Sequence, residues 1–314
     1  MSMPRITILM PTYNKEAYIA QAIDSVLMQL TCYDFDLLII DDKSTDNSLE
    51  IAKQYQSQYP EVIKIIEKEK NEGCLSTMLK GYENLKLDYF CVLDPDDYWI
   101  SEYKLQNAIH FLENHLDFTM YVSDAYVDKE GKQTPYLDIV EDMDFDFDHV
   151  DNLRWGVTSG MIYRNVIFYY GVPDYLYHQV GSKNEVTFEG DSYRNIIHLQ
   201  KGKLHVAKDI ESVYRIQPNG IWSSRSKFDR NVLNAELFLT MFHCLDKIKP
   251  EFFIIKCWRF CKANLELMYG SDTNSFKLNH ESEFVKRFYD VMSECLHYLD
   301  FSSCQLDTMA LNIK

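Results

Sequence analysis

The sequence lacks an excess of basic residues, and this absence excludes one broad class of protein. Lysine and arginine number 32 against 48 aspartate and glutamate, which gives a formal net charge of −16. A protein that binds nucleic acid needs a concentrated basic surface to neutralise phosphate groups. We therefore expect no nucleic-acid partner.

Long apolar runs are also missing. No run reaches the roughly 18 residues that a membrane-spanning helix requires. The chain begins Met1-Ser2-Met3-Pro4-Arg5 and leads directly into a strand-like segment, whereas a secretory signal would continue with an apolar core. We expect a cytoplasmic protein.

Two common chemical motifs are absent as well. The eight cysteines form no CxxC pair and no cysteine–histidine spacing suited to zinc. We interpret them as reduced, mostly buried thiols. No GxGxxG follows the first predicted strand, and this disfavours a nicotinamide-dependent dehydrogenase.

The first part of the chain alternates short β-branched runs with longer stretches whose apolar residues lie three and four apart. This alternation predicts an α/β fold with a mostly parallel sheet flanked by helices. Strands are expected over 6–10, 35–40, 62–66, 89–93, 119–122, 204–206 and 212–216, with an ordered segment over 157–164. Helices are expected over 18–30, 49–59, 75–85 and 103–114, and from about 191 onward. Ser44, Thr45 and Asp46 are candidate N-caps of the second helix, and acid-rich residues 141–148 favour a solvated loop.

The pattern changes after residue 225 to long helices, expected over 228–248, 252–268 and 284–299. We therefore predict one domain over 1–225 and a C-terminal helical region over 226–314. The second of these helices interleaves lysine and arginine with aromatic residues, which would suit a peripheral contact with the inner face of the membrane. A helix packed on its neighbours with a solvated basic face is the commoner alternative.

Two acidic clusters follow predicted strands. Asp41 and Asp42 come after 35–40, and Asp94, Asp96 and Asp97 come after 89–93. Ligands of open α/β sheets bind at the carboxyl ends of the strands, and clustered carboxylates repel one another unless a cation is present. Hard oxygen ligands suit Mg²⁺ or Mn²⁺. The alternative is that these residues form turns and helix N-caps.

Several segments, in their order along the chain, resemble the inverting glycosyltransferases of family 2, which have the GT-A fold. In the first hundred residues they are Pro11-Thr12-Tyr13-Asn14, Ile40-Asp41-Asp42-Lys43-Ser44-Thr45-Asp46, Asn71-Glu72-Gly73 and Leu93-Asp94-Pro95-Asp96-Asp97-Tyr98-Trp99. Further on, 157–164 is similar to the family's acceptor-side strand, Glu189-Gly190-Asp191 to its base-bearing segment, and 212–223 to its closing segment. The resemblance covers about 4–225. It implies a nucleotide-binding half over about 1–125 and an acceptor-binding half over about 126–225.

The resemblance also implies roles for individual residues. The donor nucleotide would be bound by Pro11, Thr12, Tyr13, Asn14, Asp42, Asn71, Gly73 and Asp94. Tyr13 would stack on uracil unless it is buried, and Asp42 would accept the imide N–H. Asp94 and Asp96 match the DxD element, which holds Mn²⁺ or Mg²⁺ against the diphosphate.

On the acceptor side the resemblance implies that Asp191 is the catalytic base, with Glu189 as the substitute. A plain helix cap is the alternative for Asp191. Acceptor or phosphate-side candidates are Thr158, Ser159 and Trp222, although burial is as plausible for the tryptophan.

Three residues depart from the family pattern. Met78 stands where many members have an arginine, Gln217 where many have a histidine, and Lys43 where a glycine is common. The function expected is inverting, metal-dependent transfer of a sugar from a nucleotide donor, most simply a UDP-sugar. The acceptor would be a hydroxyl of a glycan or lipid-linked molecule in surface polysaccharide synthesis. The alternatives are a catalytically weak nucleotide-sugar-binding module and a nucleotide-sugar hydrolase.

Overall fold

A computed structural model describes residues 5–148, 156–182, 185, 188, 190–217, 220, 224–245, 249–269 and 283–301. The chain divides into two compact units. The first comprises residues 1–181 and 189–217, and the second comprises 182–188 and 218–314.

A ten-stranded sheet forms the centre of the first unit. Its strand order is β3-β2-β1-β4-β9-β6-β10-β5, with β7 paired to β6 and β8 paired to β10. The strands are β1 Arg5–Thr12, β2 Asp34–Asp41, β3 Ile63–Glu67, β4 Tyr89–Val92, β5 Tyr98–Trp99, β6 Phe118–Lys129, β7 Lys132–Pro135, β8 Met143–Phe145, β9 Met161–Arg164 and β10 Lys203–Arg215. The helices of this unit are α1 Ile19–Leu27, α2 Ser48–Gln58, α3 Cys74–Glu83, α4 Lys104–Asn114, α5 Asp174–Tyr177 and α7 Asp191–Leu199, with short 3₁₀ turns over Thr158–Gly160 and Phe168–Tyr170.

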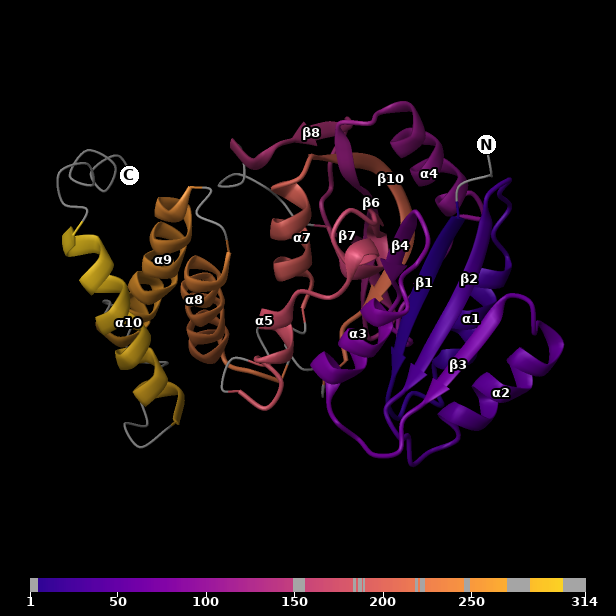
Figure 1. Cartoon of the computed structure of the whole chain (residues 1–314), viewed down its shortest axis with the longest axis horizontal. Coiled ribbons are helices and arrows are strands. Elements are labelled where there is room, and N and C mark those ends of the chain that lie inside the picture. Colours follow the sequence, from indigo (N-terminus) through magenta and orange to yellow (C-terminus); the bar gives the residue numbers. More distant parts are fainter. Residues whose placement is uncertain are drawn as a thin grey trace. The chain divides into compact units, whose positions relative to one another are not determined.

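The parallel part of the sheet was predicted from the sequence and is confirmed. Strand β1 pairs in parallel with both β2 and β4, and β2 pairs in parallel with β3. Figure 1 shows these strands side by side in indigo and purple. Because the strands run the same way, their carboxyl ends lie at one edge of the sheet.

The remainder of the sheet is mixed. Strand β9 runs antiparallel to β4 and β6, whereas β6 and β10 are parallel to each other. The prediction of two short strands over 204–206 and 212–216 is wrong, because β10 is continuous. Its register against β6 shifts between Ala207 and Ile210 and again before Ser212, and these irregularities interrupt the alternating pattern on which the prediction depended.

Two local predictions are also wrong. The acid-rich segment 141–148 contains β8, which pairs with β10, and the Asp144 carboxylate accepts a hydrogen bond from His205 Nδ1 at 2.7 Å. Helix α2 has Asn47 at its N-cap position, and Asn47 makes no side-chain capping bond. Ser44 and Thr45 instead bond to Asn14 in the turn after β1. Asp46 accepts a hydrogen bond from the Ser48 backbone N–H at 2.9 Å, so it binds the first N–H of α2 although it is not at the N-cap position.

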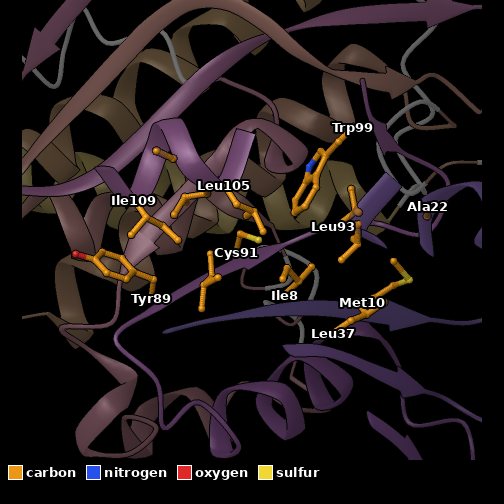
Figure 2. Close-up of a cluster of buried hydrophobic side chains, with 14 of the residues drawn as sticks. Ile8, Met10, Ala22, Leu37, Tyr89, Cys91, Leu93, Trp99, Leu105 and Ile109 are labelled. Atoms are coloured by element: carbon orange, nitrogen blue, oxygen red, sulfur yellow. The ribbon is translucent and has the colours of Figure 1, made fainter. Parts of the chain in front are cut away.

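The core lies between β1, β4 and the helices on one face of the sheet. Ile8 and Met10 of β1 are fully buried with residues of α1 and α4, whereas Leu9 points to the other face, against Gly81 of α3. Figure 2 shows Ile8 and Met10 among Cys91, Leu93 and Trp99. Burying each large apolar side chain contributes about 1.5–3 kcal/mol, so this cluster fixes the strands whose ends carry the acidic residues.

The second unit contains α8 Lys227–Cys244, α9 Pro250–Tyr269 and α10 Glu283–Phe301. Cys257, Cys261 and Cys295 are fully buried in it. All the cysteines in the described ranges are free thiols, as predicted, although Cys32 is exposed. None of the helices in these ranges combines the length and apolar composition that crossing a membrane requires.

Candidate active site

The ends of β1, β2 and β4 bring the predicted donor residues to one edge of the sheet. Thr12 pairs with Asp41 in the register of β1 and β2, and the Asp42 amide donates to the Thr12 carbonyl at 2.8 Å. Pro11 and Thr12 belong to β1 itself, and the Thr12 side chain is buried. Tyr13 is 43% exposed, which rules out the buried alternative.

Asn14 connects the loops that follow β1 and β2. It has a φ of +52°, and its amide oxygen accepts a hydrogen bond from the Thr45 backbone N–H at 2.8 Å. Its own backbone N–H donates to Ser44 Oγ at 3.1 Å. Asn14 therefore has a structural role, in which it holds together the loops that follow β1 and β2.

The Asp42 carboxylate organises the turn 71–73. It accepts hydrogen bonds from the backbone N–H groups of Glu72 at 2.9 Å and Gly73 at 2.8 Å, and it forms an ion pair with Lys68 at 2.7 Å. Asn71 is exposed, and its side-chain oxygen also accepts from Gly73 N–H, at 3.2 Å. Lys68 was not singled out in the sequence, although a lysine directly after β3 is the signal that could have indicated a partner for the strand-end acids.

Asp94 and Asp96 carry the excess of negative charge at the end of β4. Asp94 is half-buried. Burial and the neighbouring Asp96 carboxylate raise the pKa of Asp94 to about 6, against the opposing positive charges of Arg194 and Lys15. Asp96 Oδ2 lies 2.5 Å from the Lys15 ammonium nitrogen. The two carboxylates therefore favour a cation between them.

Asp97 differs from its neighbours because it is buried and structural. Its Oδ1 accepts a hydrogen bond from the Arg215 backbone N–H at 2.9 Å, which connects the segment before β5 to the end of β10. Burial raises the pKa of Asp97 well above its ordinary value, and the charge of Asp94 adds to this rise. The Arg215 guanidinium donates to the Asp96 carbonyl oxygen and lies 4.4 Å from the centre of the Tyr98 ring.

The chemistry of this donor set fits a divalent cation. No group of three or more histidine, cysteine, aspartate or glutamate side chains gathers into a metal cage within the described ranges. Mg²⁺, however, is usually held by one or two protein carboxylates and takes its other ligands from phosphates and water. Asp94 and Asp96 provide two hard oxygen ligands of this kind.

Helix α7 brings Asp191 to the same site. Asp191 is the first residue of α7, and Gly190 occupies the N-cap position, so the capping alternative is wrong. After burial and Asp96, the charge of Asp191 is a further cause of the raised pKa of Asp94. The two carboxylates therefore interact electrostatically across the site.

Arg194 is a site residue that the sequence reading missed. Its side chain is 2% exposed, and Nη1 donates to Tyr82 Oη at 3.1 Å and to the Gly190 carbonyl at 3.4 Å. It is the buried cation that opposes the carboxylate charges near Asp94. Its position three residues after Asp191, on the same helix face, was the available signal.

The acceptor-side candidates Thr158 and Ser159 lie in the 3₁₀ turn before β9. Thr158 is half-buried, and the Ser159 side chain is buried while its carbonyl accepts from Trp99 Nε1 at 2.9 Å. Thr158 is thus the more accessible of the two. Glu189 and Trp222 lie outside the described residues.

The three departures from the family pattern have distinct structural settings. Met78 is buried in α3. Gln217 Oε1 accepts a hydrogen bond from the Tyr18 hydroxyl at 3.2 Å. Lys43 has a φ of +62°, a left-handed conformation that glycine adopts without strain.

Comparison with known proteins agrees with the α/β fold described above. Residues 7–172 match the model described as Glycosyl transferase family 2. An uncharacterized glycosyltransferase of Haemophilus influenzae is 36% identical over 146 residues, which cover 46% of this chain and 57% of that protein. The minor teichoic acid biosynthesis protein GgaB of Bacillus subtilis is 26% identical over 295 residues, which cover 91% of this chain and 32% of that protein. This chain therefore spans only part of the length of either relative.

Among solved structures, S. aureus TarS 1–349 in complex with UDP-GlcNAc matches with a TM-score of 0.64 and 16% identity, covering 93% of this chain and 80% of that chain. This likeness confirms the predicted GT-A fold. The family model matches more than half of the chain, and the chain accordingly belongs to glycosyltransferase family 2.

Proposed function

We propose that this protein is an inverting, metal-dependent glycosyltransferase that moves a sugar from a UDP-sugar to a hydroxyl group of a surface-polymer acceptor. The observation that carries the proposal is that the negative charges of Asp96 and Asp191 both raise the pKa of Asp94, which follows the end of β4 in a family 2 fold. Asp94 and Asp96 would share one chemical task in such a transfer, and Asp191 would perform another.

On the leaving-group side, Asp94 and Asp96 would hold Mn²⁺ or Mg²⁺. The ion supplies positive charge for the diphosphate as its bond to the anomeric carbon breaks. Tyr13 offers an exposed ring on which uracil stacks. The 71–73 turn, fixed by Asp42, forms the other boundary of the base site.

On the opposite side, Asp191 is the proposed base. The acceptor oxygen forms a bond to the anomeric carbon while the carbon–oxygen bond to the diphosphate breaks, and the hydroxyl proton passes to the Asp191 carboxylate. The attack comes from the face opposite the leaving group, so the anomeric configuration inverts.

Names of similar proteins support the choice of donor and acceptor. TarS is described in complex with UDP-GlcNAc, which supports a UDP-sugar donor. GgaB is named for minor teichoic acid biosynthesis, which supports an acceptor in a surface glycan or a lipid-linked precursor of one. Helix α9 carries exposed Arg259 and Lys262, and these charges support a peripheral contact with an anionic membrane.

A thermal-shift panel tests the donor site. UDP-, GDP-, CMP- and dTDP-sugars are each added with and without Mn²⁺, because a ligand that binds only the folded state raises its stability. We expect a Mn²⁺-dependent shift with UDP-sugars. Asp96→Ala should abolish this shift, whereas Glu61→Ala, at an exposed position before β3, should retain it.

Product analysis then separates transfer from its alternatives. A transferase gives a new glycoside only when an acceptor is present, a hydrolase gives free sugar without one, and a binding module gives neither. A shift with none of the nucleotide sugars would contradict the proposed donor site.

A further inference from the structure

Lys15 provides an internal cation at the predicted metal ligand. It follows Asn14 in the turn between β1 and α1, and its backbone N–H donates to Ser48 Oγ at 2.6 Å. Its ammonium nitrogen lies 2.5 Å from Asp96 Oδ2, with 29% and 17% of the two side chains exposed. Among the described residues, Asp96 is the hydrogen-bond acceptor that the structure gives this ammonium.

The Lys15 ammonium and a metal ion would compete for the Asp96 carboxylate, most directly at Oδ2. A Mg²⁺ ion binds carboxylate oxygen at about 2.0–2.1 Å, so an ammonium that keeps its own short contact to Oδ2 would lie against a like charge. The Lys15 backbone is held by Ser48, but its four-carbon stem has several rotatable bonds. The head group is therefore able to leave Asp96 while the turn stays in place.

A donor diphosphate would offer the displaced ammonium a new partner. Phosphate oxygens form strong charge-assisted hydrogen bonds with lysine. Helix α3 supplies no cation at Met78, which is buried and apolar. Lys15, on the neighbouring β1–α1 turn, carries a positive charge that compensates for this absence.

We propose that Lys15 is a placeholder cation, which neutralises Asp96 in the free protein and moves to the diphosphate when a divalent ion and the donor bind. This inference rests on the proposed metal-dependent donor site and adds a positioning residue to it. It makes metal binding and nucleotide binding mutually dependent. The metal ion displaces Lys15 toward the diphosphate, and the diphosphate draws Lys15 away from Asp96.

Direct metal titration tests the exchange. The probe is Mn²⁺, whose free concentration is followed by electron paramagnetic resonance, in the full chain with and without UDP. We expect Lys15→Met to bind Mn²⁺ about tenfold more tightly than the wild type without UDP, because a competing unit charge a few ångströms away is removed. In saturating Mn²⁺, the same variant should bind UDP about tenfold more weakly.

Two further variants make the titration specific. Lys15→Arg keeps the charge and should keep a metal affinity close to that of the wild type. Lys43→Met removes an exposed lysine that pairs with Glu67 at 3.3 Å, and it should change neither affinity. Equal melting temperatures of all four proteins would show that the variants are folded.

The outcomes separate the two proposals. Equal Mn²⁺ affinities for the wild type and Lys15→Met without UDP would overturn the exchange, while UDP-dependent Mn²⁺ binding in both would leave the donor site intact. Absence of Mn²⁺ binding in every protein, with and without UDP, would overturn the metal-dependent function and the exchange together.

Discussion

Lys68 and Asp42 form a buried ion pair, in which the ammonium nitrogen lies 2.7 Å from Oδ1 and the side chains are 8% and 5% exposed. The same carboxylate binds the backbone of Glu72 and Gly73. The pair therefore connects the ends of β2 and β3 to the turn that precedes α3, which we propose contacts the nucleotide base.

Removal of one partner of this pair should destabilise the fold strongly. Lys68→Met leaves the Asp42 carboxylate buried without its counter-ion, a change that typically costs about 3–5 kcal/mol. Urea denaturation measures the free energy of unfolding. Lys64→Met is the matched control, since its ammonium pairs with Asp36 at 2.9 Å but is 57% exposed, and such pairs contribute about 0–1 kcal/mol. Equal losses in the two variants would show that the buried pair has no special role.

The backbone at Lys43 predicts the effect of a substitution in the adjacent loop. Lys43 has a φ of +62°, where a β-branched side chain is strained and glycine is not. We expect Lys43→Gly to be more stable than Lys43→Val by about 1 kcal/mol, as measured by urea denaturation. Both variants lose the exposed contact with Glu67, so their difference isolates the backbone effect. A valine variant as stable as the glycine variant would contradict the assigned conformation.

His198 should make the free energy of unfolding depend on pH in the acid range. Burial lowers the pKa of His198 to about 3, and Nδ1 donates to the Arg194 carbonyl at 2.7 Å. In the unfolded chain a histidine titrates near 6.5, so below that pH the unfolded state binds more protons and the folded state loses about 1.4 kcal/mol per pH unit. This loss should develop between pH 6.5 and 3.

Substitution of His198 tests whether this residue causes the predicted decrease of the unfolding free energy at low pH. His198→Gln should have a shallower decrease of unfolding free energy between pH 6.5 and 4 than the wild type. Denaturant titrations at several pH values measure the slope, and His110→Gln, at an exposed position on α4, is the control. Parallel slopes for the wild type and His198→Gln would contradict the buried, neutral state of this ring.

The strand-end acids were predictable because each ends a continuous apolar run. Asp42 and Asp94 lie where the pattern places them, since parallel strands deliver their carboxyl ends to one edge. The partners of these acids were not predictable in the same way. Lys15 and Lys68 are distant in sequence from Asp96 and Asp42, and the choice of an ion-pair partner depends on tertiary packing that periodicity does not encode.

The position of β8 was unpredictable for the same reason, because it depends on a partner distant in sequence. Asp144 belongs to an acidic segment that charge repulsion alone assigns to solvent, yet its carboxylate binds His205 of β10. This pairing, 61 residues apart, allows β8 to join the sheet. The residue that favours a strand here, His205, is therefore distant in sequence, and segment 141–148 does not itself indicate the pairing.

Substitution of Asp191 tests whether this residue is the catalytic base. The measurement pairs the Kd of the UDP-sugar in Mn²⁺ with the rate of sugar transfer to purified teichoic acid, for the wild type, Asp191→Asn and Asp174→Asn. Asp174 is the control because it is likewise the first residue of its helix. We predict that Asp191→Asn keeps the Kd and loses about 10²–10⁴-fold in transfer rate, which is the usual contribution of a general base. A wild-type transfer rate in Asp191→Asn would show that the base lies elsewhere and would contradict the proposed mechanism.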